Sequence, residues 1–167
     1  MAEIVTAQGK IVLIDDDDLP IVESKRWQAY GGPECYYAVN ISRINGKLVS
    51  TYMHRLIIAP PSGMVIDHIN GNGLDNRRSN LRIATHAQNN QNRKMRAGSE
   101  VPFKGVCRTG SKKNPYCVRM RIDGKSAYIG SYPTAEEAAL TYDRMAIKLH
   151  GEFALLNFPN FFSKKLH

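Results

Sequence analysis

Two short apolar runs on either side of a turn-rich segment constrain the fold of this chain more than any other feature. The first run, residues 64–68, ends in the adjacent pair Asp67-His68, and the second covers residues 80–84. The segment between them, residues 70–76, consists of Gly, Asn, Asp and one Leu. Gly and Asn tolerate the positive φ angles of tight turns. The pattern therefore predicts two antiparallel strands joined by a reversal of the chain.

A polar helix is expected directly after the second strand. Thr85 is a good residue to cap its N-terminus, and Asn89 then lies one turn inside it. Antiparallel pairing brings Asn80 near His68, where the Asn80 carbonyl could accept a hydrogen bond from the ring and fix its tautomer. Successive strand residues point to opposite faces, so Asp67 and His68 need not compete for one atom.

These side chains suit the hydrolysis of a phosphodiester bond. The reaction requires an activated water, neutralised charge on the phosphoryl oxygens and a stabilised leaving oxygen. His68 can accept a proton at neutral pH because the pKa of an imidazole is about 6.5, and Asp67 is an oxygen ligand for a hard cation. An Asp-His pair alone would indicate only a polar turn after a strand. The addition of Asn80, the capped helix and Asn89 favours a nuclease site.

The constellation closely resembles the HNH (His-Me finger, ββα-metal) nucleases, particularly the phage and intron-encoded homing endonucleases. The resemblance implies that Asp67 and Asn89 are metal ligands, that His68 is the general base and that Asn80 orients it. Because an amide oxygen is a hard donor, Asn in place of a final His favours one Mg2+ or Mn2+ ion per site over Zn2+. His86 and Asn90 remain alternatives to Asn89. The matching residues are His54-Arg55-Leu56, 67–72, 74–78, 80–82, Thr85 and 89–92.

Several cations surround the expected site. Arg77, Arg78 and Arg82 are plausible phosphate clamps, because a guanidinium can bind a phosphate through two hydrogen bonds. Arg55 is either a phosphate contact or an ordinary surface cation. His54 is expected beside the site as a structural hydrogen-bonding residue rather than as a catalyst.

The first sixty residues indicate a β-rich region. Asn45-Gly46 is a strong signal for a hairpin between the strands 36–44 and 47–53. Residues 15–18 are four aspartates, which lack the alternation of a calcium loop and are expected to cap a helix over residues 19–27. Other expected features are a strand over residues 10–14, a break at Gly31-Gly32-Pro33, and a short helix that starts near Tyr52 and ends before Pro60.

The C-terminal third predicts a separate small sheet with one helix. Three strands are expected over residues 105–109, 116–122 and 126–132, with turns that include Gly110-Ser111 and Asp123-Gly124, and a helix follows Thr134 and Glu137 in a capping box. The middle strand alternates apolar residues with Arg119 and Arg121. A helix can cover only one face of the sheet. The cationic face is then left for a ligand, and such a sheet can enter the major groove of DNA.

This third resembles the APETALA-type (ethylene-response-factor) DNA-binding domain almost without a gap from Phe103 to Pro159. The resemblance rests on residues 103–106, 129–132, 134–139, Tyr142-Asp143 and 156–159. It implies that four side chains contact DNA: Lys104, Arg119, Arg121 and Tyr128. Cys107 stands where the family usually has an arginine, with Arg108 one place later, so the family's target sequence cannot be carried over.

Composition agrees with a polyanionic partner. The chain has 23 Lys and Arg against 15 Asp and Glu, for a net charge of +8, and many of the cations lie between residues 93 and 128. Residues 93–102 are expected to be a basic linker in which Arg93 and Lys94 follow the DNA backbone, although a solvated tether is an alternative. No apolar run could span a bilayer. Three widely spaced cysteines argue against zinc fingers and disulfide frameworks.

The expected fold class is therefore α+β: a β-rich N-terminal region with a ββα-metal finger, then a three-stranded antiparallel sheet packed on one helix. The expected domains are a nuclease domain (1–92), the linker (93–102), a DNA-binding domain (103–160) and a tail (161–167). The expected function is site-selective, metal-dependent cleavage of double-stranded DNA that leaves 5′-phosphate and 3′-hydroxyl ends. A single active site would nick one DNA strand. The protein is expected to act as a monomer or a dimer on DNA. It is expected to be encoded by a phage or an intron and to work in the cytoplasm of a host cell. The alternative is a non-catalytic DNA-binding regulator with a decayed nuclease domain.

Overall fold

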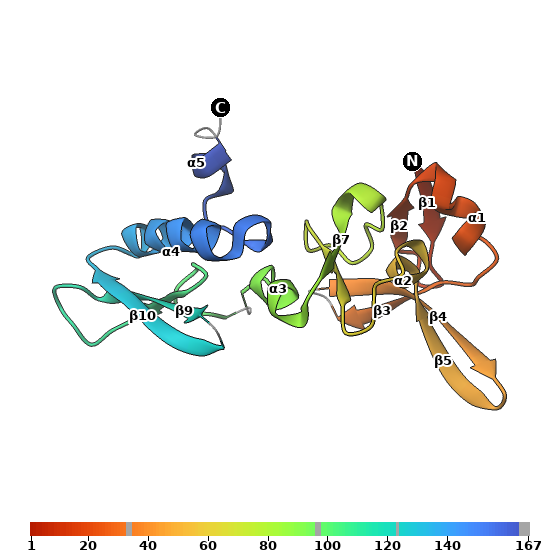
Figure 1. Ribbon diagram of the computed structural model, residues 1–167, viewed down its shortest axis with the longest axis horizontal. Helices are drawn as coiled ribbons and strands as arrows, with labels where there is room; N and C mark the ends of the chain where they lie inside the picture. Colours follow the sequence, from red (N-terminus) through yellow and green to blue (C-terminus); the bar gives the residue numbers. More distant parts are fainter. Residues whose placement is uncertain (33–34, 96–97, 123, 164–167) are drawn as a thin grey trace. The chain divides into compact units, whose positions relative to one another are not determined.

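The computed structural model describes residues 1–32, 35–95, 98–122 and 124–163 and divides the chain into two compact units, residues 1–90 and 91–167 (Figure 1). Among the described residues, the strands form four small antiparallel sheets, accompanied by a few helices. This mixture confirms the α+β class. No helix in these ranges combines the length and apolar character that crossing a membrane would require.

The N-terminal unit contains three of the sheets, and the hairpin expected at Asn45-Gly46 is confirmed. Asn45 and Gly46 have φ angles of 48° and 78°, as a tight two-residue turn requires. The strands are β1 (Ala2–Val5), β2 (Ile11–Ile14), β3 (Gln28–Gly32), β4 (Cys35–Ile44), β5 (Lys47–Tyr52), β6 (Val65–His68) and β7 (Leu81–Ala84). The helices are η1 (Asp16–Asp18), α1 (Leu19–Val22), α2 (Met53–Ile57), η2 (Arg78–Asn80) and α3 (His86–Gln91).

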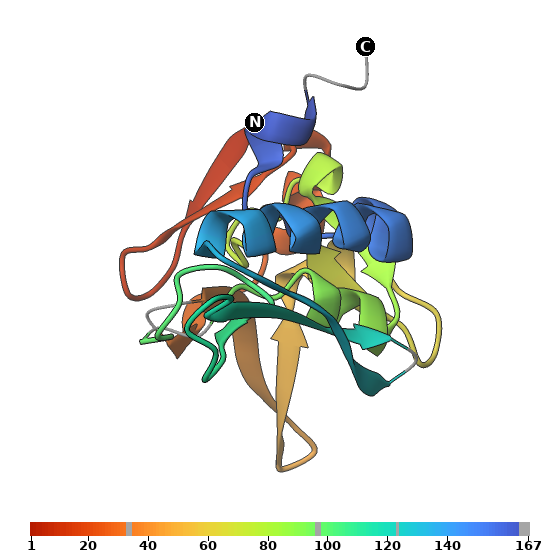
Figure 2. The same cartoon turned by 90° about the vertical axis from the view of Figure 1, so that its left-hand side faces the viewer.

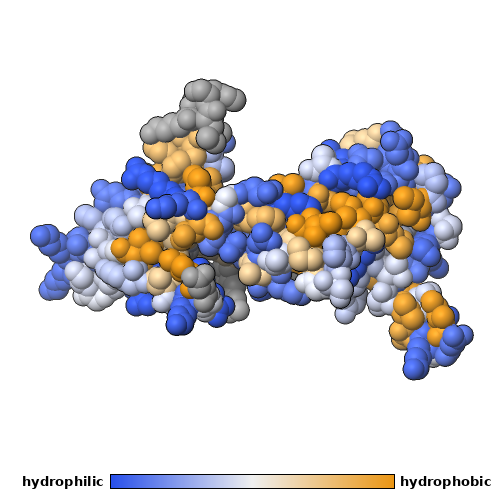
Figure 3. All heavy atoms as spheres, in the orientation of Figure 1, coloured by the Kyte–Doolittle hydropathy of each residue, from blue (hydrophilic) through white to orange (hydrophobic). Residues whose placement is uncertain are grey.

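The core of this unit joins all three sheets to the short helices. Its buried members include Val12, Ile14, Val22, Trp27, Met53, Ile66 and Leu81. Because Ile66 lies on β6 and Leu81 on β7, the strands that carry the expected site are anchored in this core. The free end of the β4–β5 hairpin, by contrast, exposes the apolar side chains of Ile44 and Leu48, and Figure 3 shows orange atoms at this tip.

The helix expected over residues 19–27 is wrong in extent. The aspartates do stand at the N-terminal end of the short helix, with Asp18 at the N-cap position of α1, but they do not cap it through their side chains. The α-helix covers only Leu19–Val22, and neither Asp15 nor Asp18 makes a side-chain capping hydrogen bond. Their carboxylates instead accept hydrogen bonds from Arg78, far away in the sequence. Arginine is a stronger donor to these carboxylates than the N–H groups of a helix terminus, because the interaction is charge-assisted and partly bidentate.

The C-terminal unit is a three-stranded sheet covered by one long helix, as the sequence predicts. The sheet order is β10-β9-β8, and Figure 2 shows α4 lying across it. Thr134 caps α4 by accepting a hydrogen bond from the Glu137 N–H. The elements are β8 (Val106–Arg108), β9 (Tyr116–Ile122), β10 (Lys125–Tyr132), α4 (Ala135–His150), η3 (Gly151–Phe153) and α5 (Pro159–Ser163).

A few predictions fall on residues outside the described ranges. They are the Pro33 end of the expected break, Arg96 within the expected linker, Asp123 of the expected turn, and residues 164–167 of the expected tail.

Candidate active site

The two strands and the helix expected around Asp67-His68 are present in that order. Strand β6 pairs with β7 in an antiparallel register that places Asp67 opposite Arg82 and His68 opposite Leu81. The Ile69 N–H donates to the Asn80 carbonyl, which continues the pairing beyond the strands. Helix α3 begins two residues after β7 ends. Asp67 and His68 are only 4% and 6% exposed, so this hairpin holds both side chains within the protein.

The Asp67 carboxylate lies against the guanidinium of Arg82. The Arg82 Nε and Nη2 atoms donate to Asp67 Oδ2 at 2.8 and 2.7 Å. The side chain of Arg82 is 12% exposed and that of Asp67 is 5% exposed, so solvent screens this pair weakly. Arg82, expected as a phosphate clamp, therefore neutralises the carboxylate that is expected to bind a metal.

The His68 ring is enclosed by polar and aromatic side chains. Its Nε2 atom is 3.2 Å from Asn76 Oδ1, and this contact is buried. Its ring centroid is 5.1 Å from that of His54 and 5.7 Å from that of Tyr37. Burial lowers the pKa of His68, and the hydrogen bond to Asn76 and the nearby carboxylates oppose this effect. The ring is therefore neutral near pH 7 and retains a nitrogen lone pair that can accept a proton.

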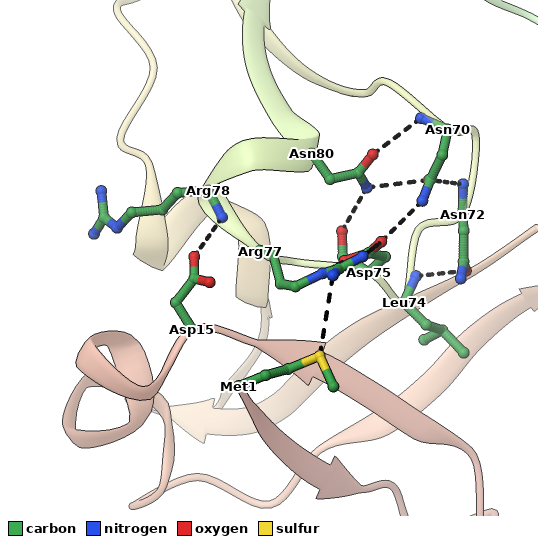
Figure 4. A network of polar contacts seen from close by, with 9 residues as sticks. All are labelled: Met1, Asp15, Asn70, Asn72, Leu74, Asp75, Arg77, Arg78 and Asn80. Atoms are coloured by element: carbon green, nitrogen blue, oxygen red, sulfur yellow. Dashed lines mark hydrogen bonds and ion pairs between the residues drawn. The ribbon is translucent and has the colours of Figure 1, made fainter.

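Asn80 lies beside the end of β6, as the strand pairing predicts, and its side chain bonds to the loop that follows His68. Its Oδ1 accepts from the Asn70 N–H at 3.0 Å, and its Nδ2 donates to Asn70 Oδ1 at 3.1 Å and to the Asp75 carbonyl at 2.8 Å (Figure 4). Asn80 ends the one-turn helix η2, which directs its side chain into the loop between the strands. It thus holds the β6–β7 loop (residues 69–80) closed, and the amide beside the His68 ring belongs to Asn76.

Asn76 lies in the segment 74–78 that resembles the HNH nucleases, but no separate role was expected for it. It lies in the turn-rich segment, where asparagine has an ordinary explanation in turn geometry. Nothing local distinguishes it from Asn70 or Asn72. Its contact with His68 depends on the three-dimensional path of the loop. The only sequence signal for this contact was the position of Asn76 at the end of the turn-rich segment 70–76.

Two of the expected phosphate clamps hold the β6–β7 loop in place. Arg77 donates from Nε and Nη2 to the two carboxylate oxygens of Asp75, both at 2.7 Å, and this lowers the pKa of Asp75. Arg78 binds the buried Asp18 through Nε and Nη2, and its backbone N–H donates to Asp15 (Figure 4). These ion pairs give both arginines a structural role, although half of the Arg78 side chain remains exposed.

His54 lies beside the site, as expected, on helix α2. It is 7% exposed, and burial together with the charges of His68 and Arg55 lowers its pKa to about 3. Within the described residues, two buried nitrogens have no hydrogen-bond partner, His54 Nδ1 and Asn76 Nδ2. Arg55 is exposed on the same helix, where it is accessible to a ligand.

Helix α3 carries the three candidates for a second metal ligand. Asn89 is half-buried, whereas His86 and Asn90 are exposed, so Asn89 is the best placed toward the protein interior. Among the described residues, no three His, Cys, Asp or Glu side chains gather as a metal-binding group. A single carboxylate with an amide oxygen still fits Mg2+, which commonly binds one or two protein oxygens together with waters and substrate phosphates.

The C-terminal sheet presents its cationic residues on the face away from α4. Val118 and Met120 are buried in the core that includes residues of α4, so the alternating Arg119 and Arg121 lie on the opposite face, where both are exposed. Tyr128 is exposed and pairs with Arg119 in the β9–β10 register. The structure therefore brings these three residues together on one surface.

Lys104 differs from the other residues expected to contact DNA. Its Nζ donates to the backbone carbonyls of Gln91 and Arg93, and burial lowers its pKa to about 8. It therefore stabilises the chain that leads into the C-terminal sheet. Arg93 and Lys94 are exposed.

Comparisons with known proteins point first to HNH endonucleases. A family model described as "HNH endonuclease" matches residues 52–91, which include His54, Asp67, His68, Asn80 and Asn89. An uncharacterized HNH endonuclease of Acanthamoeba polyphaga mimivirus is 35% identical over 153 residues, which cover 90% of this chain and 76% of that protein.

Two further comparisons are more limited in extent or in identity. The ethylene-responsive transcription factor 1 of Solanum lycopersicum is 47% identical over 38 residues, which cover 23% of this chain and 16% of that protein. A solved structure of the HNH homing endonuclease I-HmuI, described as DNA binding and cleavage, aligns with 77% of this chain and 78% of its own, at 21% identity and a TM-score of 0.33.

Proposed function

The chain belongs to the HNH endonuclease family, and from this premise we propose that it is a metal-dependent DNA endonuclease that hydrolyses one phosphodiester bond per active site. The observation that carries the proposal is the buried, neutral imidazole of His68 next to the carboxylate of Asp67 on a strand paired with β7. One site would nick one strand and leave 5′-phosphate and 3′-hydroxyl ends. A double-strand break would require two such events.

His68 acts as the general base. Its low pKa keeps the ring neutral at the pH of a cell, so the ring can accept a proton from the attacking water without first losing one. Tyr37 and His54 pack against the ring and restrict its rotation. Asn80 serves the same end indirectly, because it closes the loop that follows His68.

Asp67 and Asn89 would hold one hard divalent cation, Mg2+ or Mn2+, and the bound ion would neutralise negative charge on the phosphoryl oxygens. The exposed Arg55 and the exposed portions of Arg77 and Arg78 are the candidate contacts to flanking phosphates. Because Arg82 already binds Asp67, it contributes positive charge at the centre of the site.

The C-terminal unit would direct the nuclease to particular DNA sites. This proposal is supported by the exposed Arg119, Arg121 and Tyr128 on one face of a sheet, and by the short similarity to an ethylene-responsive transcription factor. A sheet of this size can enter the major groove, where Arg side chains contact base edges or phosphates. Arg93 and Lys94 would contact the phosphate backbone outside this sheet.

The test is cleavage of a random-sequence plasmid pool with Mg2+ or Mn2+, followed by mapping of the ends. His68→Ala should reduce the cleavage rate by about 10²- to 10⁴-fold without weakening DNA binding. The double variant Arg119→Ala with Arg121→Ala is the matched contrast, and it should weaken or broaden site selection while cleavage continues. Undiminished cutting by His68→Ala would refute the assignment of the base. Wild-type protein that binds DNA and leaves it intact with both metals would instead favour a DNA-binding regulator.

A further inference from the structure

We propose that Asn76 is the positioning residue of the active site: its amide oxygen accepts a hydrogen bond from His68 Nε2–H and fixes the ring in the tautomer that carries its proton on Nε2. The proposal rests on the proposed function in naming His68 the general base. It adds a residue that neither the motif nor the sequence pattern assigns to this role.

The chemistry of the contact determines the tautomer. An amide oxygen can only accept a hydrogen bond, so with Asn76 Oδ1 oriented toward the ring, 3.2 Å from His68 Nε2, this contact is a hydrogen bond when Nε2 carries the proton. In the neutral ring, the lone pair then resides on Nδ1, which is the nitrogen able to take a proton from water. Asn76 is 0% exposed, so solvent water does not compete for its oxygen.

The backbone around Asn76 is fixed by β2, which makes its side chain a dependable partner. The Asn76 N–H donates to the Leu13 carbonyl at 2.8 Å, and the Leu13 N–H donates to the Leu74 carbonyl at 2.9 Å. Asp75 forms an isolated parallel bridge with Leu13, and its carbonyl accepts from Asn80 Nδ2. The core strand β2 therefore holds the end of the β6–β7 loop, and that loop presents Asn76 to His68.

Close packing of the same loop adds a second constraint. A Cβ atom on Gly73 would lie 2.5 Å from the Tyr36 carbonyl and 2.6 Å from the Tyr37 ring, so the loop backbone lies directly on Tyr37. Tyr37 in turn packs against His68. The aromatic neighbours thus restrict the plane of the imidazole, and Asn76 decides which of its nitrogens carries the proton.

The other half of the Asn76 amide supports a role in the active site over a role in packing. Its Nδ2 is buried without a hydrogen-bond partner among the described residues. An unpartnered buried donor destabilises the folded protein, and an apolar side chain of similar size would avoid this cost. What asparagine provides and leucine cannot provide is the acceptor for His68 Nε2–H.

The tautomer can be measured directly by two-bond 1H–15N correlation NMR on the full-length protein labelled with 15N-histidine. His68→Ala identifies the signals of His68. The wild type should show a protonated Nε2 and an unprotonated Nδ1. Asn76→Leu should lose this fixed tautomer, whereas Asn76→Asp, which retains an acceptor oxygen of the same reach, should keep it.

The cleavage assay supplies the second readout. Asn76→Leu should lower kcat by roughly 10- to 100-fold with unchanged DNA affinity, and Asn76→Asp should recover part of this loss. Asn72→Ala is the matched control: it removes a hydrogen bond within the same loop, from Leu74 N–H to Asn72 Oδ1, without touching His68. It should leave both tautomer and kcat unchanged.

Three results would overturn the proposal: a wild-type His68 protonated on Nδ1, an Asn76→Leu variant that keeps both the tautomer and kcat, or an Asn72→Ala variant as impaired as Asn76→Leu. If Asn76→Leu fails to fold, the wild-type tautomer and its retention in Asn76→Asp still decide the question. The NMR readout requires no cleavage. A wild type that does not cut DNA would therefore refute the nuclease function without affecting the assignment of Asn76.

Discussion

Acidification should destabilise the N-terminal unit through His54. Burial lowers the pKa of this ring from 6.5 to about 3 in the folded protein, with smaller contributions from His68 and Arg55. The unfolded chain binds a proton at His54 below pH 6.5, and the folded chain does so only near pH 3. The free energy of unfolding must therefore fall as the pH drops through this window.

The size of the effect follows from the two pKa values. At pH 5 the folded ring is neutral and the unfolded ring is almost fully protonated, which costs about 2 kcal/mol of stability at His54 alone. The lowered pKa of His68 adds a loss of the same sign. A comparison of the wild type with His54→Leu isolates the contribution of His54, because the variant lacks the His54 imidazole and retains that of His68.

Trp27 makes this measurement specific to the N-terminal unit. It is the sole tryptophan of the chain and lies in the core with Ile66 and Leu81. Urea unfolding followed by its fluorescence at pH 7 and pH 5 should show that the wild type loses about 2 kcal/mol more than His54→Leu. The matched control is His86→Ala, at an exposed histidine of α3, which should behave like the wild type. Equal losses in the wild type and His54→Leu would refute the reasoning.

Two further predictions concern the framework of each unit. Arg78→Ala removes the guanidinium from Asp18, which is 1% exposed, and should lower the urea midpoint measured by Trp27 fluorescence. An unchanged midpoint would mean that solvent replaces the arginine. Gly105→Ala places a Cβ 2.1 Å from the Tyr142 ring at a φ of 75°, and it should destabilise the C-terminal unit by more than about 2 kcal/mol in calorimetry. Gly124→Ala has a similar φ of 77° but open space around it, so it should cost clearly less.

Local patterns were sufficient to predict the framework of the site. Turn chemistry and apolar runs identified the β6–β7 pair, the β4–β5 hairpin and the C-terminal sheet with its helix, because each of these elements is built from neighbours in the sequence. The alternation along β9 also located Arg119 and Arg121 on the face away from α4. The periodicity of apolar residues indicates which face of a strand is buried, and this is sufficient to place the two arginines on the exposed face.

Partners that are distant in sequence were not predictable in this way. Arg78 and Asp18 are 60 residues apart, and an ion pair between separate segments leaves no periodic signal. The Asp15–Asp18 run was therefore assigned to a helix end, the nearest local explanation. The role of Asn76 was not predicted for a related reason. Turn geometry already explains an asparagine at this position, and its contact with His68 appears only when the loop packs on β2.

The pairing of Asp67 with Arg82 implies a competition between the arginine and a metal ion for the same carboxylate. Arg82→Gln should lower the stability of the metal-free protein by about 3 kcal/mol, because it leaves a buried carboxylate without its cation. A divalent ion at Asp67 would restore that charge balance, and removal of Arg82 also removes a repulsive positive charge. Mg2+ should therefore raise the Trp27 unfolding midpoint more in Arg82→Gln than in the wild type, by the linkage between ligand binding and stability. Asp67→Asn should abolish this Mg2+-induced rise of the midpoint in both backgrounds. An equal rise in the wild type and in Arg82→Gln would show that the arginine and the metal ion do not compete for Asp67.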